Sequence, residues 1–321
     1  MTWQPKDKLA SAVALEVLIH GPLGRAELAR RLGLAPATLT RISTELIASG
    51  LLAEVPEATQ RTSGRPTIPL DVVPSSHYFL GIKLTDSALD ATVIDLKATP
   101  RDSYRVPLDS LTPIRVIRAI ADLAHRARSA YRIDAIGIAV GGIVNADGTV
   151  ESAPFLKWHD VPLASLVSEA TRLPAFVAND LSAYTQIQHW FGSGTGHSNF
   201  AVITVGAGVG AGAVIADELL VGHQGSTGMV GEAWTTWGQK FHDVLADEPL
   251  RLAASEAAGR EVALAELRFT DDPAVSAVLD RAATALGELV VLAKQFWGPE
   301  KILLTGEGIV HFESRMDMVR R

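Results

Sequence analysis

Four short side chains and one arginine near the start of the chain have the types and spacing needed to contact nucleic acid. Threonine hydroxyls form hydrogen bonds with base edges, and an arginine guanidinium binds guanine or phosphate oxygens. A helix predicted from about Pro36 to Ser49 places these residues on one face, away from the apolar positions Leu39 and Ile42. The candidate DNA-contacting residues of this helix are Ala37, Thr38, Thr40, Arg41 and Thr44.

The residues around this face predict the elements that position it. The spacing of apolar residues indicates three helices over residues 7–50, interrupted at Gly21-Pro22 and at Gly33. The second of these helices is expected over residues 25–32. A helix-turn-helix needs a small residue where its helices cross, here Ala29, and a tight turn four residues later, where Gly33 allows a positive φ. An ordinary helical hairpin is the alternative interpretation. The combination of these two residues with the strands that follow favours DNA binding.

Two short strand-like runs follow the helices, at 51–55 and 67–72, and they enclose a polar stretch. Three helices, two strands and a polar loop predict a winged helix-turn-helix domain over residues 1–74. Glycine and proline restrict the backbone around a single arginine in Gly64-Arg65-Pro66. Arg65 is therefore predicted to enter an A·T-rich minor groove or to contact phosphate. A solvated arginine at the end of a loop is the alternative.

From residue 75 the pattern changes to alternating strands and helices, which indicates an α/β body. In a first lobe over 75–191, strands are expected at 78–84, 88–96, 102–106, 135–140 and 175–178, with helices at 113–130 and 180–191. In a second lobe over 192–321, strands are expected at 200–205, 210–216, 219–221 and 301–305, with helices at about 250–258, 261–268 and 273–297. Both lobes begin with three strands joined by tight turns and continue into helices, which indicates an internal duplication.

Composition and charge limit the classes of protein to be considered. The 321 residues carry a formal net charge of −7, yet residues 1–70 contain eight Lys and Arg against six Asp and Glu. The helical segment is thus suited to phosphate while the body is acidic. The absence of cysteine excludes disulfides and thiolate metal sites. We expect a cytoplasmic protein, because no targeting signal opens the chain and no apolar run reaches membrane-spanning length.

Several segments of the body, taken together, resemble the ROK family of repressors, open reading frames and sugar kinases. The resemblance implies an actin-like, ribonuclease-H-like fold of two lobes around a cleft, in dimers or tetramers. The segments that carry it are Ile136-Gly137-Ile138-Ala139-Val140, Asn145-Ala146-Asp147-Gly148-Thr149-Val150, 157–163, Ala178-Asn179-Asp180 and 205–212.

The loop after the first strand of the body departs from the kinases of that family. Those kinases have Asp-x-Gly-Gly-Thr, whereas this chain has Lys83 at the position of the acid and Thr85-Asp86 at the two glycines. Side chains then occupy the space where backbone must approach phosphate, and Asp86 adds a repelling charge. We therefore expect no ATP-dependent phosphorylation and no cofactor. The glycine-rich turn over 206–212 is interpreted as a tight hairpin.

A second group of polar residues is similar to the sugar-binding residues of the family. Asn179 and Asp180 match its sugar-binding pair, in which the Asp is the catalytic base of kinases. A helix N-cap at Asp180 is the alternative interpretation. Glu232 matches the acid of the motif Gly-Glu-x-Gly-His, but Trp234 and Thr235 replace the second Gly and the His. The predicted effector site therefore consists of Asn179, Asp180 and Glu232.

The replaced histidine and the missing cysteines also remove the family's zinc ligands, so no metal site is predicted. Packing of Trp234, Trp237 and Phe241 is expected to hold the segment 233–245 instead. Phe155 and Trp158 are interpreted as core residues.

The predicted function is that of a DNA-binding transcriptional regulator, specifically a repressor of carbohydrate-related genes, whose sugar-kinase-like body dimerises and senses an effector without catalysis. Its expected partners are a double-stranded DNA operator, a sugar or sugar-derivative effector, and one or three further copies of the chain, with no membrane. One alternative is an ATP-dependent sugar kinase with a DNA-binding appendage, against which Lys83 and Asp86 argue. The other is an effector-independent regulator, which the replaced zinc motif favours.

Overall fold

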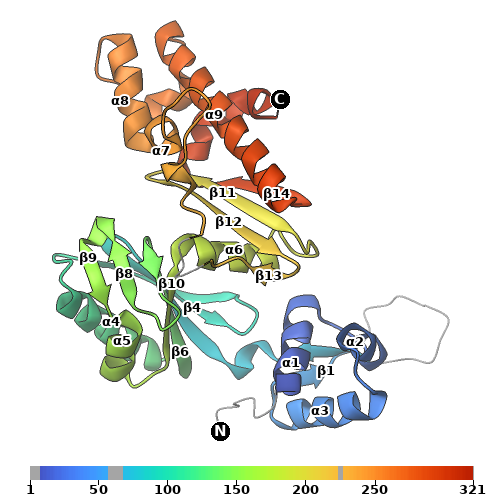
Figure 1. Cartoon of the computed structure of the whole chain (residues 1–321). Helices are drawn as coiled ribbons and strands as arrows, with labels where there is room; N and C mark the ends of the chain where they lie inside the picture. Colours follow the sequence, from blue (N-terminus) through green and yellow to red (C-terminus); the bar gives the residue numbers. More distant parts are fainter. Residues whose placement is uncertain (1–7, 57–67, 223–226, 321) are drawn as a thin grey trace. The chain divides into compact units, whose positions relative to one another are not determined.

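The computed structural model describes residues 8–56, 68–222 and 227–320 of the chain (Figure 1). The chain forms two compact units, residues 1–178 and 179–321. The boundary lies ahead of the helix that begins at Asp180, whereas the sequence analysis had placed it after Phe191. The predicted boundary at residue 74, inside the first unit, stays a prediction. Among the described residues, the structure contains no helix with the length and apolar character needed to cross a membrane.

The first unit begins with a small helical domain that has its own core. Its helices are α1 (Lys8–His20), α2 (Arg25–Leu32) and α3 (Pro36–Ala48). Its strands β1 (Leu52–Glu54) and β2 (Leu70–Val72) pair antiparallel, with Leu52 opposite Val72. Val13, Val17, Leu28, Ile42 and Leu46 are buried together between the three helices. The bounds of α2 agree with the predicted ones. The helix ends at Gly33, which adopts a left-handed conformation with a φ of 62° that glycine tolerates best.

A five-stranded sheet follows in the same unit, with the strand order β10-β6-β3-β4-β5. Its strands are β3 (Tyr78–Leu84), β4 (Ala88–Asp95), β5 (Pro100–Pro107), β6 (Ile133–Val140) and β10 (Ala175–Asn179). Leu80, Ile82, Ile136 and Ile138 on one face pack against α4 (Pro113–Arg128) and α5 (Leu163–Thr171). Strand β5 lies at the edge of this sheet and is mostly exposed.

The sequence analysis missed α5 and a three-stranded sheet between β6 and β10. This sheet has the order β7-β8-β9, from β7 (Ile143–Val144), β8 (Val150–Ala153) and β9 (Trp158–Val161). Trp158 is buried as expected, and its indole Nε1 donates a hydrogen bond of 2.6 Å to the carbonyl of Leu111. The expectation that Phe155 is a core residue is wrong, because 60% of its surface is exposed at a turn.

The second unit repeats the strand order of the first. Its sheet has the order β13-β12-β11-β14. Counted along the chain within this unit, these are the third, second, first and fourth strands. In the first unit the third, second, first and fourth strands also lie side by side, as β5-β4-β3-β6. The strands are β11 (Phe200–Val205), β12 (Val209–Ile215), β13 (Glu218–Leu219) and β14 (Lys301–Thr305), and α6 (Asp180–Phe191) packs beside β12. The repeated order agrees with the duplication inferred from the sequence.

Helices pack on the other side of this sheet around Phe241, Leu286 and Phe312, which are fully buried. They are α7 (Phe241–Leu245), α8 (Asp247–Ala258), α9 (Pro273–Trp297) and α10 (Met316–Val319). The predicted helix at 261–268 is instead a 3-10 helix, η5 (Leu264–Phe269), preceded by extended backbone at Ala263. Two further 3-10 helices are η4 (Val230–Glu232) and η6 (Glu307–Arg315).

Candidate functional site

The turn between α2 and α3 fixes how α3 is presented. Gly33 adopts the left-handed conformation, with φ 62° and ψ 29°, and its N–H bonds to the carbonyls of Ala29 and Arg30. The N–H of Leu34 also donates to the carbonyl of Ala29, at 2.9 Å. Ala29 is only 9% exposed, so a larger side chain there would not fit between the helices. The two residues singled out in the sequence therefore make the tight crossing that was predicted.

The outward face of α3 carries the predicted DNA-contacting residues. Leu39, Ile42 and Leu46 are buried, and the opposite face is left to solvent. Ala37, Thr40, Arg41 and Thr44 are exposed, and Thr38 is half-buried. The helix starts with Pro36, whose fixed φ suits a first helical position. The structure thus brings all five residues of α3 onto one element.

The hydroxyl groups of two of the threonines donate hydrogen bonds to backbone carbonyls of α3. Thr40 Oγ1 donates to the carbonyl of Pro36, and Thr44 Oγ1 donates to the carbonyl of Thr40, both at 2.8 Å. A hydroxyl whose proton is engaged keeps its acceptor lone pairs. These side chains can therefore accept from the amino groups of adenine or cytosine and place a methyl group beside thymine.

Every arginine between residues 8 and 56 is paired with a carboxylate, which the sequence analysis did not foresee. Arg41 Nη1 lies 2.8 Å from Glu45 Oε1 one turn further along α3, and both side chains are more than half exposed. The i, i+4 spacing of these two residues was a signal that could have predicted the pair. A phosphate or base that binds Arg41 must therefore compete with Glu45.

The other arginines of the helical domain are similarly engaged. Arg31 pairs with Glu16 and Glu27, and Arg25 Nη2 lies 2.7 Å from Glu54 Oε1. Hydrogen bonds from Arg30 and then Arg31 lower the pKa of the Glu27 carboxyl. The ion pairs partly cancel the positive charge that the composition of this segment suggested. Arg65, the candidate contact of the wing, lies outside the described residues, as does the loop that carries it.

The candidate effector residues Asn179 and Asp180 lie at the start of α6. Asn179, and not Asp180, is the N-cap: its side-chain oxygen accepts from the N–H of Ser182 at 3.0 Å. The N-cap interpretation is therefore shifted by one residue. Asp180 is half-buried, and its Oδ1 accepts from the N–H of Leu181 at 2.9 Å. Within the described residues, no hydrogen bond involves the other oxygen of the Asp180 carboxylate, Oδ2.

Glu232 ends η4, and its side chain is 62% exposed. Lys240 Nζ lies 2.7 Å from Glu232 Oε2, and this hydrogen bond lowers the pKa of the Glu232 carboxyl. Gly210, next to the start of β12, packs against Leu181 of α6, and Gly231 of η4 packs against the carbonyl of Val209. The starts of α6 and η4 thus both border the same end of β12.

The segment 233–245 is ordered by packing and hydrogen bonds, although not by all the aromatic residues expected. Phe241 is fully buried, and Thr235 exchanges hydrogen bonds with the backbone of Gln239. Trp237 is half-buried beneath the guanidinium of Arg281. The expectation for Trp234 is wrong, because 63% of its surface is exposed. No cluster of three or more metal-ligating side chains occurs in the part of the chain that the structure describes.

The turn between β3 and β4 satisfies its own backbone. Thr85 Oγ1 accepts from the N–H groups of Ala88 at 3.0 Å and Ser87 at 3.4 Å. A phosphate cradle needs such N–H groups to point at its ligand. The turn that corresponds to the kinase phosphate loop is therefore closed on itself.

The glycine turn of the second unit faces acidic groups that the sequence analysis missed. A methyl group on Gly206 would lie 3.0 Å from Glu307 Oε2, and the N–H of Asp247 donates to the carbonyl of Gly206 at 2.8 Å. Burial raises the pKa of the Asp247 carboxyl, the charge of His311 opposes this effect, and Glu307 adds to it. Two carboxylates beside this turn disfavour a bound phosphate.

Comparison with known proteins assigns the chain to a family. The sequence pattern of the ROK family matches residues 79–321, and the chain belongs to that family. The chain is 27% identical to the xylose repressor of Bacillus subtilis (strain 168) over 222 residues, which span 67% of this chain and 57% of the repressor. It is 22% identical to the DNA-binding transcriptional dual regulator NagC of Escherichia coli (strain K12) over 315 residues, 90% of this chain and 77% of NagC.

Kinases and solved structures of the family are also similar. The chain is 35% identical to the glucokinase of Streptomyces coelicolor over 147 residues, 46% of either protein. A ROK family transcriptional regulator, a homologue of the E. coli MLC protein, superposes with a TM-score of 0.82 at 23% identity, covering 98% of this chain and 87% of that one. A Streptomyces griseus glucokinase bound to glucose and AMPPNP gives a TM-score of 0.65 at 21% identity, covering 76% and 87%. These structures show the mixed α/β, actin-like sugar-kinase fold of the family.

Proposed function

We propose that the protein is a DNA-binding transcriptional regulator, a repressor of carbohydrate-related genes, and that residues 1–74 are a winged helix-turn-helix. The observation that carries the proposal is the exposed polar face of α3, which the Gly33 turn presents to solvent next to the β1–β2 pair. The similarity to NagC, a DNA-binding transcriptional dual regulator, and to the xylose repressor supports it, since these two alignments cover 90% and 67% of this chain.

The test is a selection from duplex DNA with a randomised centre, using the full chain. The proposal expects enrichment of a motif with two half-sites about one helical turn, or a multiple of it, apart. The matched control replaces Thr38, Thr40, Arg41 and Thr44 by Ala together, which keeps the helix and erases its polar face. Wild-type protein that enriches no sequence over this control would remove the proposal.

We propose further that the ROK body does not catalyse phosphoryl transfer. The self-bonded β3–β4 turn and the carboxylates of Asp247 and Glu307 beside the Gly206 turn support this proposal. The alternative, an ATP-dependent sugar kinase with a DNA-binding appendage, draws support from the glucokinase alignment. Against it, the N–H groups of Ser87 and Ala88 in the turn that corresponds to the phosphate loop donate to Thr85 Oγ1 and so do not point at a ligand.

A sugar or sugar derivative is the effector that we propose for Asn179, Asp180 and Glu232. The support is the Asp180 Oδ2 atom, for which no partner is found among the described residues, and the exposed carboxylate of Glu232 beside Lys240; both can accept from sugar hydroxyls. A thermal-shift screen of sugars and sugar phosphates tests it, because a ligand of the native state raises Tm. A hit should lose its effect in Asp180→Ala but keep it in Asp217→Ala, a carboxylate of similar chemistry at the β12–β13 turn. If no sugar raises Tm, the effector-independent regulator replaces this proposal.

Self-association through the ROK body completes the proposal. A homodimer, or a homotetramer built from two of them, would carry paired α3 helices to paired half-sites. Sedimentation velocity of the full chain tests this expectation, and a monomer at micromolar concentration contradicts it.

A further inference from the structure

One face of the sheet in the first unit is open. Leu80, Ile82 and Ile136 face α4 and α5, whereas Phe79 and Ala135 alternate with them and point to the other face. Phe176 of β10 is 67% exposed. Strands that pair in parallel, as β3 and β6 do, are usually covered on both faces. The open face is therefore a place where an apolar group could be buried.

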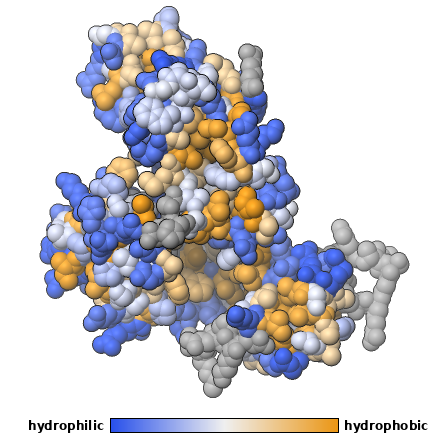
Figure 2. Space-filling view, viewed as in Figure 1, coloured by the Kyte–Doolittle hydropathy of each residue, from blue (hydrophilic) through white to orange (hydrophobic). Residues whose placement is uncertain are grey.

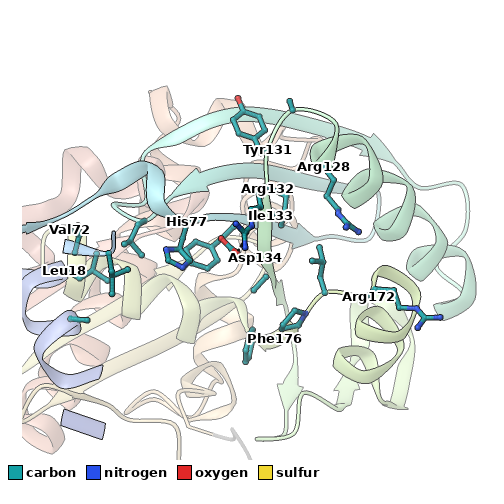
Figure 3. Close-up of a pocket in the computed structure, with 18 of the residues that line it drawn as sticks. Leu18, Val72, His77, Arg128, Tyr131, Arg132, Ile133, Asp134, Arg172 and Phe176 are labelled. Atoms are coloured by element: carbon teal, nitrogen blue, oxygen red, sulfur yellow. Dashed lines mark ion pairs between the residues drawn. The ribbon is translucent and has the colours of Figure 1, made fainter. Parts of the chain in front are cut away.

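A cavity of about 1000 Å³ lies over this face and extends to α1 of the helical domain (Figure 3). Its apolar wall is formed by Leu15 and Leu18 of α1, Val72 of β2, Phe79 and Phe176. Leu15 is 40% exposed, and apolar residues gather over α1 on the face of the helical domain seen in Figure 2. Volumes of about 300–1000 Å³ are typical of pockets that hold small molecules.

The polar wall of the cavity is positively charged. It contains Arg128, Arg132 and Arg172 but only one acid, Asp134. Asp134 accepts from the N–H of Tyr78 at 3.3 Å and lies 4.0 Å from Arg132 Nε, so its charge is partly used within the wall. Within the described residues, no carboxylate lies within 4.0 Å of the guanidinium of Arg128 or Arg172. Among the described residues of the wall, three arginines face one acid, so their formal charges sum to an excess of positive charge.

We propose that this cavity binds a small amphipathic anion, an apolar body that carries one carboxylate or sulfonate. The apolar body would lie between α1 and Phe176, and the acid would pair with the arginines, of which Arg132 lies centrally in Figure 3. The pocket is separate from Asn179, Asp180 and Glu232, which belong to the other unit. Binding itself does not depend on the proposed function. An effect on DNA affinity does depend on it, and would arise because the ligand contacts both the helical domain and the sheet.

The test is a fluorescence titration of the full chain with 8-anilinonaphthalene-1-sulfonate, an apolar anion. We expect one saturable site, a raised Tm, displacement by dodecanoate and no displacement by dodecyltrimethylammonium, which has the same tail and the opposite charge. Phe176→Asp and Arg132→Glu should each weaken binding at least tenfold, because both side chains are mainly exposed and the fold does not depend on them. The matched controls are Phe296→Asp, 78% exposed, and Arg115→Glu, 54% exposed, which should leave binding unchanged.

Three results would overturn the proposal. The first is equal binding by Phe176→Asp and by wild type, and the second is equal displacement by the cationic detergent. The third is a change of sedimentation in Phe176→Asp without loss of the probe, which would assign the face to contact between two copies of the chain. Anion binding without any selected DNA motif would leave this site standing and reject the regulatory function, so the two proposals fail separately.

Discussion

Replacing Arg41 by Ala distinguishes a role in DNA binding from a role in the fold. The ion pair with Glu45 is exposed at both ends, and exposed i, i+4 pairs contribute about 0.3–0.5 kcal/mol. Alanine has the highest helix propensity, which offsets part of this loss. The free energy of unfolding should therefore change by no more than about 0.5 kcal/mol. A base or phosphate contact is worth more, so DNA affinity should fall by about 1–3 kcal/mol, roughly 5- to 150-fold.

The partner variant Glu45→Gln makes the prediction sharper. Glu45 forms an ion pair with the Arg41 guanidinium. If Arg41 binds DNA as proposed, the DNA must displace Glu45, whose negative charge would also repel nearby phosphates. Removing this competition should tighten binding by about 1.7- to 2.3-fold, the equivalent of the pair's roughly 0.3–0.5 kcal/mol. In Arg41→Ala the same Glu45→Gln change should act only through repulsion and so have a smaller effect.

The assay is fluorescence anisotropy with a duplex taken from the selection experiment, at several salt concentrations. If Arg41 contacts phosphate, Arg41→Ala should also reduce the salt slope by about one. Arg115→Ala is the matched control, because Arg115 is 54% exposed and pairs with Asp109 far from α3 in the sequence. Equal affinity of Arg41→Ala and Arg115→Ala would refute the placement of α3 at the DNA.

Four further predictions follow from the structure. Gly33→Ala should lower the free energy of unfolding by about 1 kcal/mol, measured by urea titration, because its φ of 62° strains a side chain even though nothing lies within 4 Å of the new methyl group. Burial lowers the pKa of His311 below 6.5, so that the unfolded chain takes up a proton at a higher pH than the folded chain, and the free energy of unfolding should fall as the pH drops below 6.5. In His311→Asn, a plot of Tm against pH should be flatter in this range. An unchanged slope would contradict the assignment of this pH dependence to His311. No ADP release should be seen with common hexoses and N-acetylhexosamines, and turnover abolished by Asp180→Asn would overturn this expectation. A chelator should leave Tm unchanged, and a drop in Tm restored by zinc would show a metal that we do not expect.

Much of the fold could be predicted where the spacing of apolar residues and the positions of glycines that end helices indicate the same element. Residues 25–32 and 273–297 have helical spacing and end at Gly33 and Gly298, and both helices form with these bounds. The strands β7 to β9 were missed because two to four residues are too few to show an alternating pattern. The segment 261–268 has helical composition, but its backbone is extended at Ala263 and leaves room only for a 3-10 turn.

The sequence predicts which residues of α3 are exposed, but not the hydrogen bonds and ion pairs that their side chains make. The exposed face of α3 follows from the burial of Leu39 and Ile42, which the helical period gives directly. The engagement of Arg41 by Glu45 and the committed hydroxyl of Thr40 depend on side-chain geometry that residue types alone do not specify. Asn179 is the N-cap in place of Asp180, and residue type alone does not decide between them because Asn and Asp are about equally favoured at this position.

The composition of the edge strand β5 should protect the protein from aggregation through this edge. An open strand edge offers unpaired N–H and C=O groups to any similar edge, which is a route to aggregation. β5 starts and ends with proline, and its exposed side chains include Arg101, Asp102 and Arg105. A second sheet that docked there would lose hydrogen bonds at the prolines and bury these charges. Charged substitutions on this strand should be tolerated, whereas neutral β-branched ones should reduce the concentration at which the protein remains in solution.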